Sequence, residues 1–274
     1  MAVHAALSLH RARAVRYSRG SNRNRKQKTS MSSENNSMGG PSRRHVRRMF
    51  DEIAGAYDLA NRVLSLRRDV VWRRRLTALL PSGPEPRLLD LAAGTCDVLI
   101  AAHRAGRAAP GSIGADFSAG MLREGAKKLD RAGLGGVLRL VCADATRLGF
   151  ADARFDAVTI AFGIRNVLDV NGALGEMCRV LRPGGRAVIL EFSMPGNAIL
   201  RTGYLLYFRH VLPRLGGLVS GKPDAYRYLN ESVESFPHGR AFCERMEQAG
   251  FVDVTASPLS FGIATLYTGL RPGA

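Results

Sequence analysis

Cysteine is scarce in this chain, and no long apolar run is present. The four cysteines among 274 residues are far apart and form no Cys-x-x-Cys pair, so neither a zinc site nor a disulfide framework is indicated, and a reducing compartment fits. We expect no metal. No run reaches the ~18 apolar residues of a membrane-spanning helix, and the N-terminus lacks the apolar block of a secretory signal. We therefore expect a soluble, cytoplasmic protein.

Acidic residues are nearly absent from the first part of the chain. Residues 1–50 hold twelve Lys and Arg but one acid, Glu34, so +11 of the net charge of +17 lies there. Residues 1–41 also lack helical or alternating periodicity, which predicts a disordered basic extension. An organelle transit peptide, a basic arm for nucleic acid and a true start at Met31 or Met38 stay open. Because the charge is concentrated in this tail, we expect no nucleic-acid partner for the folded part.

The rest of the chain alternates short apolar runs with helical segments. Residues 42–80 space their apolar positions by three and four, which predicts N-terminal helices. Residues 196–238 form an insertion that we expect to be helical and to cover the substrate. The pattern predicts one α/β domain over residues 42–274, with a doubly wound, mostly parallel sheet. Seven runs of strand length are candidates for its strands: 87–92, 112–116, 137–144, 155–162, 185–192, 252–259 and 264–270.

Glycine is sparse in the loop after the first predicted strand, RLLDLAAGTCDV at 87–98. Asp90 ends the strand, and Ala92 and Gly94 leave room for a ligand to approach the backbone. A dinucleotide fingerprint requires three glycines in Gly-x-Gly-x-x-Gly spacing, and only Gly94 is present, so a pyrophosphate ligand is disfavoured. A ligand with a ribose and an adenine but no phosphate needs only a turn of small residues and acidic residues that accept its hydrogen bonds.

Two more aspartates end the next two predicted strands. Asp116 is placed to accept hydrogen bonds from both ribose hydroxyls, and Asp144 could accept one from the adenine amino group. Ligands of open parallel sheets bind beyond the carboxyl ends of the strands, where these acids should meet Asp90. Each aspartate alone is equally explained as a cap of the following helix. The ordered set of three favours an adenosyl ligand.

Further motifs carry a resemblance to known proteins. The segments GADFSAGML, CADATRLGFADARFDAV and RVLRPGG resemble the S-adenosylmethionine-dependent methyltransferases of the seven-stranded class, whose last strand is antiparallel. The more specific FDEIAGAYDLAN, AFGIRNVLD, EMCRVLRPGGRAVILEFSMP and AYRYLNESVESFP resemble the quinone-biosynthesis C-methyltransferases that act on demethylmenaquinone or a polyprenyl benzoquinol. The resemblance runs from about Arg43 to Pro272. It implies methylation of a ring carbon of a polyprenyl quinol by S-adenosylmethionine, with naphthoquinol and benzoquinol substrates both open.

The resemblance and the strand ends together predict the site. The Arg165 guanidinium would hold the phenolate of the quinol and the Asn166 amide would orient it, while Tyr57 would close the pocket. Pairing of Arg165 with a structural carboxylate such as Asp156 is the alternative. The general base is left open among His210, Glu191, Asp116 and a water held by Arg165. The predicted donor-binding residues are Asp90, Ala92, Gly94, Thr95, Asp116, Phe117, Asp144, Ala145 and Phe162.

Cys96 stands where members of the resembling family usually have glycine, in a GTGD sequence. A side chain costs about 1 kcal/mol or more where the backbone needs a positive φ. We expect an ordinary backbone here, with Cys96 packed inward as a small apolar residue. A reactive thiol is the alternative.

The insertion suggests how an apolar substrate is handled. Residues 196–222 hold no acid and place Leu, Tyr and Phe at helical spacing among basic residues. A basic amphipathic helix can lie on an anionic membrane surface and accept a polyprenyl tail, which would make the protein peripheral at the inner membrane face. The alternative is that its apolar face covers the sheet or the partner in a homodimer. Tyr226 and Tyr228 are candidates for lining the substrate channel.

Two other functions are to be distinguished from quinol methylation. An RNA methyltransferase would fit the basic charge, but the chain lacks the NPPY-type tetrapeptide of amino-group methylation and a Pro-Cys pair for attack on cytosine. Methylation of another small molecule is covered by the same class-wide motifs. A non-catalytic protein that binds the donor without turnover would fit the unusual Cys96 in the loop.

Overall fold

The computed structural model describes residues 15–16, 43–211, 214 and 223–273. Its first element, β1 (Val15–Arg16), pairs antiparallel with Thr255 and Ala256 of β7 (Val252–Leu259) at the edge of the sheet. At these two positions the structure differs from the predicted disorder, because the open edge of a strand offers unpaired backbone groups. The other residues of the predicted basic extension, 1–14 and 17–41, lie outside the described residues.

Helices precede the sheet, as the spacing of apolar residues predicts. Gly55 lies at the break between the first two helices, and glycine is a poor helix former. The third helix buries Trp72 and Leu76, four residues apart, on the face that meets the sheet. The bounds are α1 (Arg43–Ile53), the 3-10 turn η1 (Ala54–Ala56), α2 (Tyr57–Leu64) and α3 (Arg68–Ala78).

Seven strands form the main sheet in the order β7-β8-β6-β5-β2-β3-β4, and β1 adds to the outside of β7. The last strand, β8 (Ala264–Leu270), is antiparallel to both β6 and β7, which confirms the prediction. Strand order reverses at β2, which lies between β3 and β5, and open parallel sheets bind ligands beyond such a point. The parallel strands are β2 (Leu88–Leu91), β3 (Ile113–Asp116), β4 (Arg139–Cys142), β5 (Phe155–Ala161) and β6 (Leu181–Phe192).

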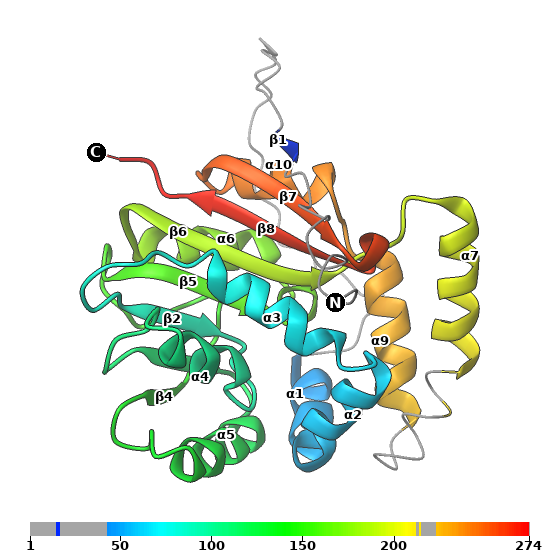
Figure 1. Ribbon diagram of the computed structural model, residues 1–274, viewed down its shortest axis with the longest axis horizontal. Coiled ribbons are helices and arrows are strands. Elements are labelled where there is room, and N and C mark those ends of the chain that lie inside the picture. Colours follow the sequence, from blue (N-terminus) through cyan, green and yellow to red (C-terminus); the bar gives the residue numbers. More distant parts are fainter. Residues whose placement is uncertain (1–14, 17–42, 212–213, 215–222, 274) are drawn as a thin grey trace, which may run out of the picture.

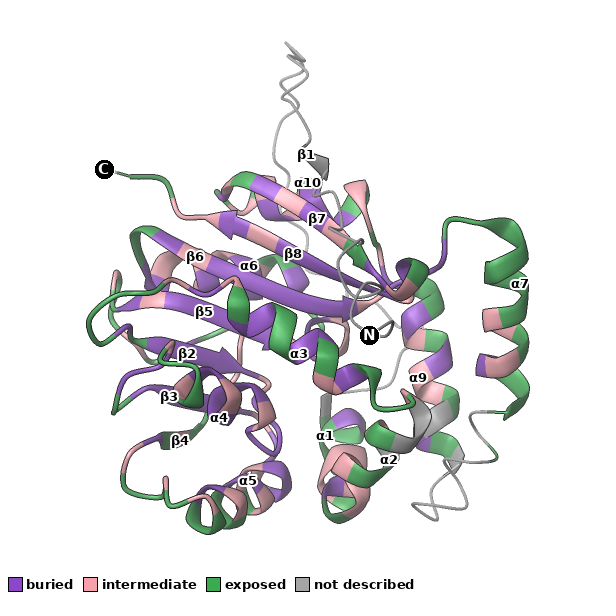
Figure 2. Ribbon diagram, viewed as in Figure 1, coloured by how far each residue is buried: buried purple, intermediate pink, exposed green. Residues whose placement is uncertain are grey.

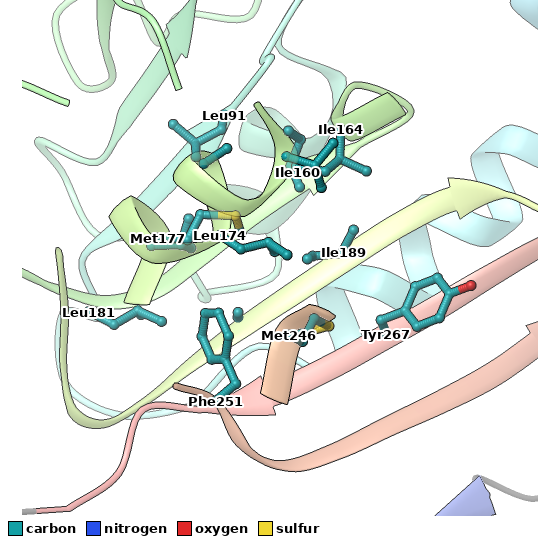
Figure 3. Packing of buried hydrophobic residues seen from close by; sticks show 14 of the residues in the cluster. Leu91, Ile160, Ile164, Leu174, Met177, Leu181, Ile189, Met246, Phe251 and Tyr267 are labelled. Carbon is teal, nitrogen blue, oxygen red and sulfur yellow. The ribbon is translucent and has the colours of Figure 1, made fainter. Parts of the chain in front are cut away.

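Helices cover both faces of the sheet (Figure 1). On one face α3, α4 and α5 share an apolar core that includes Trp72, Leu99 and Leu129. On the other face α6 and α10 pack against β6 and β8, where Leu174 and Met246 lie in a second core (Figure 3). The bounds are α4 (Asp97–Arg104), α5 (Ala119–Arg131), α6 (Val170–Val180) and α10 (Arg240–Gln248).

The described part of the insertion after β6 is mainly helical, as predicted. It lies at one end of the sheet and holds a small core of its own around Phe208 and Val233. The first helix, α7 (Ala198–Leu206), has no buried residue, as its colours in Figure 2 show. The π-helix η3 (Tyr207–Val211) and α9 (Pro223–Ser235) follow. Residues 212–213 and 215–222 of the predicted membrane-contacting segment lie outside the described residues. In the described part of the chain, none of the helices has both the length and the apolar content to cross a bilayer.

Candidate active site

The loop after β2 turns sharply through left-handed backbone. Ala92, Gly94 and Cys96 have φ angles of 46°, 54° and 69°. This turn brings the Gly94 N–H to the carboxylate of Asp116, to which it donates at 2.8 Å. The end of β3 is thereby tied to the loop, and α4 begins directly afterwards at Asp97.

Cys96 departs from the prediction in its backbone and agrees with it in its packing. The expected ordinary backbone is wrong, because the residue caps α4 in the left-handed region. The side chain is fully buried, as predicted, and a Cβ added to Gly125 of α5 would lie 2.7 Å from its Sγ. Cys96 thus has an unfavourable φ, and its sulfur atom occupies the space above Gly125. Burial raises the pKa of the thiol to about 12, which disfavours a reactive thiolate.

Asp90 of β2 and Asp116 at the end of β3 are buried on neighbouring parallel strands. Asp90 Oδ1 accepts a hydrogen bond of 2.6 Å from Thr159, whereas its Oδ2 is buried without a partner among the described residues. Burial raises the pKa of Asp90 to about 7, and it also raises the pKa of Asp116. A buried carboxylate oxygen that lacks a donor is costly unless a ligand supplies one. Asp90 can therefore receive a cationic or hydrogen-bonding ligand group.

Asp144 lies just after its strand, as predicted, but its carboxylate is used within the following turn. It follows the end of β4, and its Oδ1 accepts hydrogen bonds from the N–H and hydroxyl of Thr146, at 2.9 and 2.8 Å. Neither Asp144 nor Ala145 lines the cavity described next. The structure does not bring these two residues together with the other predicted donor-binding residues.

Two cavities meet beyond the ends of β2 and β5. The smaller is bounded by the β2–α4 loop and the end of β3, and the larger, of about 940 Å³, lies among α1, α3, α7 and α9. Phe50, Tyr57, Arg73 and Phe162 line both, so the two cavities adjoin. The predicted site residues that line the smaller cavity are Tyr57, Asp90, Ala92, Gly94, Thr95, Asp116, Phe117, Phe162 and Asn166.

Arg165 lines the larger cavity from η2 (Ile164–Asn166), just after β5. Its Nη1 donates to Glu191 of β6 at 2.7 Å and to the Phe162 carbonyl at 2.6 Å. Glu191 is fully buried and the Arg165 side chain is 7% exposed, so this is a buried ion pair. Arg165 thus has a structural carboxylate partner, but it is Glu191 and not Asp156, which pairs with Arg182.

Several polar atoms near this ion pair lack partners. Arg165 Nε, Asn166 Oδ1 and the Tyr204 hydroxyl are buried without a hydrogen bond among the described residues. Buried polar atoms in native proteins are nearly always paired, so this group can bind polar atoms of a ligand. Of the candidate bases, His210 is exposed in η3 and lines a separate surface pocket.

The N-terminal helices are fastened over the smaller cavity by two carboxylates. Asp51 of α1 accepts hydrogen bonds from the Ser118 hydroxyl at 2.6 Å and from the Gly120 N–H at 2.8 Å, at the start of α5. Asp58 of α2 accepts one from Thr95 at 2.6 Å and pairs with Lys128. Although burial opposes the shift, the bonds from Lys128 and Thr95 lower the pKa of Asp58. Both aspartates join the entry helices to the donor side of the cleft.

Arg73 is the site residue that sequence reasoning missed. Its Nη1 contacts Asp69 at 2.5 Å and Asp97 at 3.2 Å, and the residue is 9% exposed. It is the only basic residue among those described that line the smaller cavity. The surrounding sequence RRDVVWRRRL holds five arginines, and no motif separates the buried one from its exposed neighbours. The amphipathic phase of α3, with Trp72 and Leu76 inward, was the one usable indication.

The fold and the site geometry together define a class of protein. S-adenosylmethionine-dependent methyltransferases combine a seven-stranded sheet, whose last strand is antiparallel, with an acidic cleft at the end of the first parallel strand. They do not need the glycine set that binds a pyrophosphate. This chain has the same combination, with the cleft at the end of β2. Solved structures with the same fold include a SAM-dependent methyltransferase of Thermotoga maritima, with TM-score 0.59 and 16% identity over 83% of this chain and 100% of that one. A phosphoethanolamine N-methyltransferase of Haemonchus contortus has TM-score 0.60 and 13% identity over 83% of this chain and 60% of that one.

Sequence comparison identifies the family within this class. Residues 38–271 match the model of the ubiE/COQ5 methyltransferase family, and the chain belongs to this family. A demethylmenaquinone methyltransferase of Thermus thermophilus is 48% identical over 82% of this chain and 100% of its own length. One from Mycolicibacterium paratuberculosis is 45% identical over 84% of this chain and 95% of its own. The chain is thus an S-adenosylmethionine-dependent methyltransferase, as the resemblance implied.

Proposed function

We propose that this enzyme methylates a ring carbon of a reduced, demethylated polyprenyl quinol, with demethylmenaquinol as the preferred substrate. The observation that carries the proposal is the pair of adjoining cavities: a small acidic one and a large one lined mainly by apolar residues. The small acidic cavity suits the polar methyl donor, and the large apolar cavity suits a ring with an isoprenoid tail. The names of the relatives favour the naphthoquinol over the benzoquinol.

The smaller cavity fits the donor by charge. S-adenosylmethionine carries an ammonium, a sulfonium and a carboxylate, and when bound it supplies the electrophilic methyl group. Asp90, Asp97 and Asp116 line the cavity against one base, Arg73. We assign the unpartnered Asp90 Oδ2 to the ammonium and Arg73 to the carboxylate. The Asp116 carboxylate, now held by the Gly94 and Ser118 N–H groups, is assigned to the ribose.

The residues between the cavities suit activation of a quinol. A ring carbon becomes nucleophilic when the neighbouring phenol loses its proton, and a fixed positive charge stabilises the resulting phenolate. Arg165 supplies that charge, and Glu191 holds its guanidinium in place. Tyr57, which lines both cavities, and Asn166, which lines the smaller one beside Arg165, orient the ring. Burial raises the pKa of Tyr57, which keeps its hydroxyl protonated as a donor.

The insertion and α3 would enclose the tail of the quinol. Tyr204, Tyr207 and Tyr228 line the larger cavity together with Ile199 and Leu200 of α7. The side chain of Tyr226 lies outside the described residues. The exposed apolar residues of α7 support contact of residues 196–211 with the membrane in which such a quinol dissolves.

Purified full-length protein with labelled S-adenosylmethionine tests the proposal. We expect methyl transfer to a dithionite-reduced demethylmenaquinone with a short tail, slower transfer to the matching benzoquinol, and none to the oxidised quinone, whose ring carbon is not nucleophilic. Binding of the donor by calorimetry without transfer to either quinol would favour the non-catalytic alternative and refute the proposal.

A further inference from the structure

Three large apolar side chains stand in solvent around the mouth of the larger cavity. Leu66, Ile199 and Phe261 are 80%, 82% and 79% exposed, and all three line this cavity. They come from the α2–α3 turn, the first turn of α7 and the 3-10 turn η4 (Ser260–Gly262), which are far apart in the sequence. We call these three residues the apolar rim. A cluster of exposed apolar groups beside a cavity marks an interaction surface.

The backbone is also unfavourable at two rim positions. Leu66 has a φ of 50° and Phe261 a φ of 60°, in the left-handed region that favours glycine. Each such residue costs on the order of 1 kcal/mol relative to an unstrained conformation. Burial does not compensate this cost, because both side chains point into solvent. The described residues therefore give no reason for a large apolar residue at either place, and a partner outside them does.

Basic residues accompany the rim. Of the four arginines among the described residues that line the larger cavity, Arg68 and Arg75 are exposed, whereas Arg73 and Arg165 are buried in ion pairs. The one acidic lining residue, Asp69, is buried against Arg73. Arg67 and Arg68 follow Leu66 directly; both are exposed and neither forms an ion pair within the described residues. Exposed apolar side chains next to arginines match an anionic bilayer. The apolar side chains would insert among the acyl chains, and the guanidinium groups would bind lipid phosphates.

We propose that the apolar rim docks this enzyme on an anionic membrane surface, so that the larger cavity opens directly into the lipid. The proposal rests on the proposed function, because a polyprenyl quinol reaches the cavity from the bilayer without its tail crossing water. A second copy of the chain is a poorer occupant. A two-fold contact through this face would set the arginines of one copy against those of the other.

Co-sedimentation of the full-length protein with vesicles tests the rim. The vesicles are phosphatidylcholine with or without phosphatidylglycerol. Binding is measured at low salt and at ~0.5 M salt, where the Debye length is about 4 Å and binding through exposed basic residues is suppressed, so that the high-salt value reports the apolar rim. The variant is Leu66→Ser, Ile199→Ser and Phe261→Ser together. The control is Leu168→Ser, which removes a side chain that is 64% exposed outside the cavity lining. We expect the triple variant to lose at least ~10-fold in vesicle partitioning and the control to change by less than ~2-fold.

Equal binding of wild-type and triple-variant protein to phosphatidylglycerol vesicles would overturn the proposal. So would a wild-type dimer in sedimentation velocity that the triple variant dissociates while its vesicle binding is unchanged, since the rim would then face a second copy. Unchanged thermal unfolding verifies the fold, and Phe261→Ser alone replaces the triple variant if that variant unfolds. Methyl transfer to a short-tailed quinol without vesicles is measured separately. Its absence in the wild-type protein refutes the proposed function, whereas loss of vesicle binding concerns the rim alone.

Discussion

Replacing Arg73 by methionine is the sharpest test of how the donor is held. Methionine keeps an apolar stem of similar length and removes the guanidinium group, whose carbon lies 5.9 Å from the ring centroid of Phe162. What is removed is the only positive charge among the described residues that line the smaller cavity. If Arg73 binds the carboxylate of S-adenosylmethionine, the substitution should weaken binding only of ligands that carry this carboxylate.

The magnitude follows from the burial and the existing partners of Arg73. Two unit charges ~4 Å apart attract by about 4 kcal/mol at an effective dielectric constant of ~20. Asp69 at 2.5 Å and Asp97 at 3.2 Å already neutralise part of the guanidinium charge. We therefore expect a net loss of ~2–3 kcal/mol, or a ~30- to 150-fold weaker Kd.

Calorimetry with two ligands separates this effect from general damage. Decarboxylated S-adenosylmethionine keeps the ammonium and the sulfonium and lacks only the carboxylate. Arg73→Met should weaken binding of the full donor by the factor above and of the decarboxylated donor by less than ~3-fold. The double variant Arg73→Met/Asp69→Asn, which leaves no unpaired buried aspartate at this position, should show the same difference. Equal losses for both ligands would refute the assignment, because Arg73 would then act only through the fold.

Three further predictions concern Asp90, Glu191 and the Cys96–Gly125 contact. Asp90→Asn should stabilise the donor-free protein at pH 8 but hardly at pH 4. The pKa of Asp90 is raised to about 7 in the folded protein, so its ionisation destabilises the fold increasingly as the pH rises from the ordinary aspartate pKa to about 7. Equal effects of the substitution on urea unfolding at both pH values would contradict this. Glu191→Gln should lower kcat by ~100-fold while donor Kd changes by less than ~2-fold, and a parallel change in donor Kd would make the pair merely structural. Gly125→Ala should cost ~1–3 kcal/mol of unfolding free energy beside Cys96 and less in a Cys96→Gly background, where the added Cβ still lies 3.1 Å from the Gly94 carbonyl oxygen. Additive effects in the double-mutant cycle would exclude the contact with Cys96.

Much of the fold could be predicted because its signals are local. The seven apolar runs match β2 to β8 with shifts of a few residues at their ends, since buried parallel strands need unbroken apolar residues. The helical spacing of 42–80 likewise gives α1 to α3. The extra strand β1 carried no such signal, because two residues at a sheet edge pair through the backbone and not through side chains.

The candidate site was predictable only where position along the chain implies position in space. Asp90 and Asp116 end neighbouring parallel strands, so their meeting follows from the strand order. Asp144 also follows its strand, but the turn after β4 uses its carboxylate for Thr146. Cys96 shows the reverse case: its inward packing follows from its apolar character, whereas its left-handed backbone depends on the tight loop that reaches Asp116.

The sequence by itself determined the α/β sheet, the acidic donor cleft and the family, because each depends on residues close together or in a fixed order. Only the tertiary structure decided which carboxylate holds Arg165, which of the arginines in α3 enters the cleft, and that Leu66, Ile199 and Phe261 surround one cavity. Those pairings join segments up to about two hundred residues apart, and packing chooses among many chemically equivalent partners that no local pattern can rank.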